Sequence, residues 1–154
     1  MAVLHAQSTS SVSWIEHQML EHVKGALRVT LDWNAPSVSM QRKKSSVRFS
    51  FQSFCRHLDR LMRIEERDNY LEELCEVKPY LEPQVRRLRA DHDRFRRETH
   101  TLMARLEQLD EWQADEFDDC CLQIRELLAE VDQHDREEVR ILQELLSYDE
   151  GGEG

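Results

Sequence analysis

Residues 82–109, EPQVRRLRADHDRFRRETHTLMARLEQL, carry the clearest structural signal in the chain. One stripe of this stretch recurs in steps of three and four residues: Val85, Leu88, His92, Phe95, Thr99, Leu102, Leu106 and Leu109. This spacing is typical of an α-helix that turns one face toward a core. The stretch therefore predicts a helix that packs through an apolar seam containing a histidine.

Three further segments show the same helical rhythm, over about 13–33, 47–77 and 117–148. Ser13 is a candidate cap of the first helix, and a polar, serine-rich linker with Pro36 follows it. Pro79 and Pro83 end the second helix and open the next, because Pro fits a first turn but breaks a helix interior. Four such helices predict an all-α, up-down-up-down four-helix bundle. A coiled-coil dimer of longer helices is the alternative.

The ends of the chain differ from the predicted bundle in composition. Residues 149–154 are Gly-rich and offer no apolar anchor, so we expect them to form a disordered tail. Residues 1–12 precede the candidate cap and are expected to form a flexible leader. The predicted domain organisation is therefore a leader over 1–12, one bundle over 13–148 and a tail over 149–154.

Composition narrows the class of protein. The 154 residues are 40% hydrophobic and 34% charged with only four Gly and three Pro, which indicates one helix-rich globular domain. The formal net charge of -10 should repel nucleic acid and anionic membrane surfaces. No run approaches the roughly 20 apolar residues of a membrane span, and no signal peptide is evident. We therefore expect a cytoplasmic protein with neither a nucleic-acid nor a membrane partner.

Motifs of common enzymes are missing from the sequence. It has no Gly-rich phosphate loop, no Gly-x-Ser-x-Gly elbow and no His-Glu-x-x-His pair. No histidine has an acid three residues before it, which disfavours a ferritin-like di-iron oxidase. The four cysteines form no Cys-x-x-Cys pair and are expected to be reduced thiols. We therefore expect that the chain is not an enzyme.

Polar residues interrupt the predicted apolar seams at His92, His134 and Glu138. A titratable group that faces a core costs several kcal/mol unless it is paired or coordinates a metal. His134 and Glu138 are four residues apart, so they share one helix face and suit two ligands of one ion. These residues need partners, which are each other or a cation.

Short pieces of sequence occur twice. Glu16-His17 is matched by Asp91-His92, and Glu65-Glu66 by Glu137-Glu138. With the run His134-Asp-Arg-Glu-Glu138, these pieces resemble the hemerythrin-like (HHE cation-binding) family over nearly the whole chain. The resemblance implies a non-haem di-iron site in the bundle core, used for dioxygen binding, iron storage, or oxygen and iron sensing. The ligands that it implies by position are His17, Glu66, His92, His134 and Glu138.

Two positions depart from the family pattern. Aligning the two acid pairs places Met62 where the family has a second-helix histidine. Arg96 lies one turn after His92, where many members carry a further histidine. Glu65 fits the apolar stripe whereas Glu66 fits the repeat, so the ligand from the second helix stays open between them. The donor set suits iron, manganese or zinc. With iron, the site would be di-iron or mononuclear. The alternative is a degenerate, metal-free bundle that acts as a structural or protein-interaction module.

Overall fold

The computed structural model describes the backbone of residues 2–34, 39–110 and 112–149, and the side chains of 13–34, 39–110 and 112–144. Its α-helices are α1 (Ala2–Asp32), α2 (Met40–Asp68), α3 (Tyr70–Val77), α4 (Glu82–Gln108) and α5 (Ala114–Asp149), with a 3-10 turn, η1 (Pro79–Leu81), before α4. The described ranges contain no strand. The prediction of an all-α protein is confirmed.

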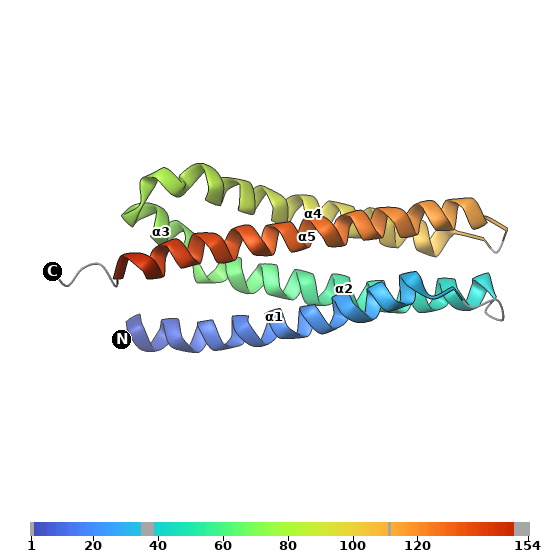
Figure 1. Cartoon of the computed structure of the whole chain (residues 1–154), viewed down its shortest axis with the longest axis horizontal. Helices are drawn as coiled ribbons and strands as arrows, with labels where there is room; N and C mark the ends of the chain where they lie inside the picture. Colours follow the sequence, from blue (N-terminus) through green and yellow to red (C-terminus); the bar gives the residue numbers. More distant parts are fainter. Residues whose placement is uncertain (1, 35–38, 111, 150–154) are drawn as a thin grey trace.

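Four long helices lie side by side along the long axis of the molecule and alternate in direction (Figure 1). They form two helical hairpins, since α1 packs mainly on α2 and α4 mainly on α5, while α2 and α4 join the two. The short helix α3 lies at the end where α1 begins and α5 ends. Within the described ranges, no helix combines the length and apolarity needed to cross a bilayer.

The predicted count of four helices is one too low, because the expected helix over 47–77 is interrupted. Asn69 has φ 52 and ψ 14, in the left-handed region, and it is both the C-cap of α2 and the N-cap of α3. Asn tolerates this conformation better than most residues because its short polar side chain bonds locally. No Gly or Pro lies at the break, so the prediction from apolar periodicity extended a single helix across it.

Two helices begin earlier in the structure than the sequence predicted. Helix α1 begins at Ala2 rather than at Ser13, and residues 2–12 contain no Gly or Pro that would stop a helix. Helix α2 begins at Met40 rather than at Val47, because the side chain of Ser39 accepts a hydrogen bond from the backbone N–H of Arg42. Of the expected tail, residues 150–154 lie outside the described residues.

Two apolar clusters fill the interior. The larger one includes residues from α1, α2, α4 and α5, among them Leu27, Phe54, Phe95 and Val131. The smaller one lies near α3 and consists of Leu71, Leu74, Leu81, Val85, Leu88 and Ile141. Along α4 and α5 the seam passes from one cluster to the other through polar residues. The bundle therefore contains a buried polar layer between two apolar clusters.

Candidate metal centre

Four long helices each contribute to the polar layer. Helix α1 provides His17, α2 provides Glu65, α4 provides His92, and α5 provides His134 and Glu138. All except the half-buried His17 are buried. Each residue continues the apolar stripe of its own helix, so the packing that buries the stripe also brings these side chains together.

Imidazole nitrogens face carboxylate oxygens inside this layer. The Nε2 atom of His17 lies 3.3 Å from Oε1 of Glu65, and Nε2 of His92 lies 3.2 Å from Oε2 of Glu65. The Nε2 atom of His134 lies 3.8 Å from Oε2 of Glu138. All three histidines thus present the same ring nitrogen to the carboxylates, with Glu65 between His17 and His92.

Three overlapping groups in this layer have ligand atoms within 4.8 Å of one another: Glu65, His92 and His134; His17, Glu65 and Glu138; and His134, Asp135 and Glu138. Imidazole nitrogen together with carboxylate oxygen suits iron, manganese and zinc. Because Glu65 belongs to two of the groups, its two oxygens can serve two neighbouring ion positions.

Two buried carboxylate oxygens in the layer lack a hydrogen-bond partner among the described residues, Glu65 Oε1 and Glu138 Oε2. A buried acceptor without a partner costs about 1–3 kcal/mol, and more when it is charged. A cation would remove this cost because it binds such oxygens directly. The residues present therefore fit a metal ion on grounds of geometry and of donor chemistry.

The outer nitrogens of two histidines are held by carboxylates. The Nδ1 atom of His92 lies 3.0 Å from Glu66 Oε1, and Nδ1 of His134 lies 3.0 Å from Asp91 Oδ2. Arg96 in turn lies 2.8 Å from Glu66. A carboxylate on the far nitrogen is the usual support of a metal-binding histidine, because it fixes the ring and leaves Nε2 to accept an ion.

The two carboxylates of the layer differ in their electrostatics. Burial and the nearby charge of Glu65 raise the pKa of Glu138 well above its usual value. Burial also acts to raise the pKa of Glu65, but the close imidazoles of His17 and His92 outweigh it and hold that pKa below its usual value. Two adjacent buried carboxyl groups do not readily ionise together without a cation. A metal ion would therefore displace a proton from this pair.

Helix α3 adds a residue that the sequence pattern did not indicate. The hydroxyl of Tyr70 donates a hydrogen bond to Glu138. Burial and the charge of Glu138 raise the pKa of Tyr70, so the phenol keeps its proton and remains a donor. Tyr70 is positioned by the break at Asn69, which no local signal predicted. Its hydrogen bond orients one oxygen of Glu138 and leaves the other for an ion.

The structure brings together four of the five residues proposed from the resemblance: His17, His92, His134 and Glu138. The side chain of Glu66 is 36% exposed and lies outside the layer, on the outer nitrogen of His92, whereas the side chain of Glu65 is 3% exposed and lies inside. The spacing of Glu65 on the apolar stripe was the signal for this arrangement. Asp91 was noted only as a neighbour of His92, yet it bonds His134 across the helix pair.

The two positions that depart from the family pattern have other partners. Met62 is buried within the larger apolar cluster. The guanidinium of Arg96 pairs with Glu66 and with Asp59, at 2.8 and 3.3 Å. Neither position supplies an imidazole, so the layer holds three histidines.

Three acidic side chains near the polar layer surround the ammonium group of a lysine. Glu21, Asp132 and Asp135 lie close enough to hold an ion. The ammonium of Lys24, which is 0% exposed, lies between them at 2.6, 3.0 and 2.8 Å. Lys24 neutralises this group and ties α1 to α5, so the group is an ion-pair network.

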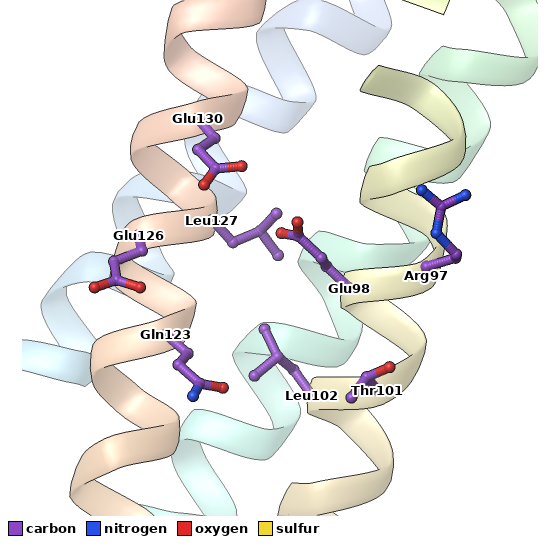
Figure 2. Close-up of a pocket in the computed structure, with 8 residues that line it drawn as sticks. All are labelled: Arg97, Glu98, Thr101, Leu102, Gln123, Glu126, Leu127 and Glu130. Atoms are coloured by element: carbon purple, nitrogen blue, oxygen red, sulfur yellow. The ribbon is translucent and has the colours of Figure 1, made fainter. Parts of the chain in front are cut away.

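A groove of about 340 Å³ separates α4 from α5 away from the polar layer. In Figure 2, Glu98 and Leu127 point toward each other across it, while Glu126 points away. The carboxylates of Glu98 and Glu130 both pair with Arg94. No histidine lines the groove, so it does not compete with the polar layer as a metal centre.

A helical bundle with imidazoles and carboxylates gathered in its core defines a cation-binding class of protein. The sequence model described as the Hemerythrin HHE cation binding domain matches residues 14–146. The chain belongs to this family, as its sequence resemblance predicted, and a metal cation is the ligand that membership implies. No curated protein and no solved structure matches the chain.

Proposed function

We propose that the polar layer binds iron through His17, Glu65, His92, His134 and Glu138, for oxygen or iron binding or sensing. The observation that carries the proposal is the pair of buried carboxylate oxygens without hydrogen bonds, facing three imidazoles. A purely structural hydrogen-bond network would be expected to satisfy these oxygens. The proposal is one of binding, and no reaction is assigned.

We propose two ion positions, since two ligand groups share Glu65. One position has His92 and His134 beside Glu65, and the other has His17 and Glu138. Glu65 takes the ligand position that the resemblance assigned to Glu66. Mononuclear binding is the other form of the same site, in which only one of the two groups is filled.

The surrounding residues prepare the site for this role. Glu66 and Asp91 orient two imidazoles, and Tyr70 holds Glu138 through its phenolic proton. The apolar clusters on both sides exclude water, which strengthens every electrostatic contact in the layer. Iron bound there would supply reversible interaction with dioxygen.

A metal-free bundle that serves as a structural or protein-interaction module is the second candidate. It is supported by Met62 and Arg96, which are packed or paired as ordinary protein groups where the family pattern has imidazoles. Under this candidate, replacing the layer histidines with Leu is neutral or stabilising, because apolar isosteres often improve a buried polar core.

Metal content separates the two candidates. The experiment is plasma mass spectrometry of protein purified without a metal-affinity tag from iron-supplemented cells, together with an absorption spectrum in air. Near two irons per chain supports the dinuclear site, and about one supports the mononuclear form. The double variant H92A/H134A is expected to lose the metal, whereas H100A, which changes an exposed histidine on the same helix, keeps it. No metal after reconstitution contradicts the proposal.

A further inference from the structure

Three carboxylates lie beside the residues that are proposed to bind the ion. Glu66 and Asp91 each hold the outer nitrogen of a histidine of the polar layer. Asp135 lies on α5, and its ligand atom is within 4.8 Å of those of His134 and Glu138. Left unpaired, each of the three carboxylates would add negative charge to the metal centre.

A basic side chain is paired with each of these carboxylates. The nitrogen-to-oxygen distances within the pairs are 2.8 Å for Arg96–Glu66, 3.0 Å for Arg94–Asp91 and 2.8 Å for Lys24–Asp135. We refer to the three basic residues as the outer cations. Arginine keeps its charge in proteins. Burial acts to lower the pKa of Lys24, but the neighbouring carboxylates outweigh it and raise that pKa, so this ammonium also stays charged.

The pairing leaves Glu65 and Glu138 to set the charge of the polar layer. A histidine binds a metal as a neutral imidazole, so these two carboxylates supply one negative charge each when an ion is bound. They balance one divalent ion, whereas one trivalent ion would leave a net positive charge in a buried site, which is costly. A second divalent ion would need anions from solvent. The charge of the layer therefore favours a divalent over a trivalent ion.

We propose that the outer cations determine the charge selectivity of the metal centre, so that it binds divalent iron in preference to trivalent iron, a role that rests on the proposed binding of iron there. Without the outer cations, Glu66, Asp91 and Asp135 would add up to three negative charges, and a trivalent ion would be better balanced. Lys24 also occupies the carboxylate of Asp135, which is then not free to become a third acidic ligand.

Lys24 should have the largest effect. Its side chain is 0% exposed, whereas that of Arg96 is 33% exposed, and a buried charge is screened least by water and salt. Its ammonium lies 2.8 Å from Asp135, which shares a ligand group with His134 and Glu138. These two steps place the ammonium within about 10 Å of the ion position, and unit charges that far apart at an effective dielectric of about 20 change an equilibrium roughly tenfold.

The test is the reduction potential of iron bound to the full chain, measured by an anaerobic redox titration that follows the absorption of the centre. This potential reports the ratio of the affinities for trivalent and divalent iron. Lys24→Met and Arg96→Met each remove an outer cation, and Asp135→Asn removes the carboxylate paired with Lys24. Arg28→Met is the matched control, because it removes a positive charge one turn farther along α1, from a side chain that is 42% exposed. Circular dichroism verifies that the variants fold.

We expect K24M to lower the potential by at least about 59 mV, which is a tenfold rise in the ratio of trivalent to divalent affinity. We expect R96M to lower it by less, D135N to raise it, and R28M to leave it nearly unchanged. A merely structural role of Lys24 would not give shifts of opposite sign for the two members of one pair.

Equal shifts in K24M and R28M, or shifts of the same sign in K24M and D135N, overturn the proposal. If K24M does not fold, R96M decides, and a potential equal to that of the wild type overturns it. Wild-type protein that binds no iron overturns the proposed function and this proposal together, whereas bound iron with unshifted potentials overturns this proposal alone.

Discussion

Two adjacent glutamates on α2 allow a sharp test of the proposed centre. Glu65→Gln and Glu66→Gln make the same chemical change one residue apart, on side chains that lie inside and outside the polar layer. The sequence repeat favours Glu66 as the ligand, whereas the structure places Glu65 beside His17 and His92 at 3.3 and 3.2 Å. The two variants therefore test whether the ligand is Glu66, as the sequence repeat predicts, or Glu65, as the packing of α2 indicates.

The expected magnitudes follow from these positions. Glu66 meets the polar layer only at the outer nitrogen of His92 and pairs with Arg96 outside it. Loss of such an outer partner typically costs 10–100-fold in metal affinity, or about 1.4–2.7 kcal/mol. Glu65 belongs to two ligand groups, so its change should cost more than about 100-fold and remove both ions.

Iron content after dialysis and competition with a coloured chelator measure these affinities. Circular dichroism shows whether each variant keeps its helices. If E66Q loses more iron than E65Q, Glu66 is the ligand and the rotation of α2 that turns Glu65 into the polar layer is wrong. Equal and small losses would place the iron elsewhere in the chain.

Three further outcomes test the fold and its electrostatics. Lys24→Met should lower the free energy of unfolding by about 2–3 kcal/mol, because it removes the ion-pair partner of the partly buried Asp135 and one of the two partners of Asp132. Arg28→Met should cost less than about 1 kcal/mol, and urea denaturation measures both. Asn69→Ala should cost about 1 kcal/mol and Asn69→Gly nearly nothing in the same assay, because of the positive φ. Metal-free protein should lose stability as the pH rises above about 4.5, since the folded-state pKa of Glu138 is raised, and Glu138→Gln should remove that loss; an unchanged pH profile would contradict the assigned charge pair.

The sequence alone determined the helical class and much of the centre. The seams of α4 and α5 could be read directly because apolar periodicity is a local property of a helix. His92, His134 and Glu138 stood out because a polar residue at a seam position is carried into the core with its neighbours. The structure confirms that all three are buried.

Tertiary structure decided which neighbours meet. One residue along a helix turns a side chain by about 100°, so the choice between Glu65 and Glu66 depended on how α2 packs against α4. The bond between Asp91 and His134 joins two helices, and Tyr70 reaches Glu138 only because the chain bends at Asn69. Periodicity describes one helix at a time, whereas these contacts depend on the relative rotation and register of several helices, which only packing of the whole bundle sets.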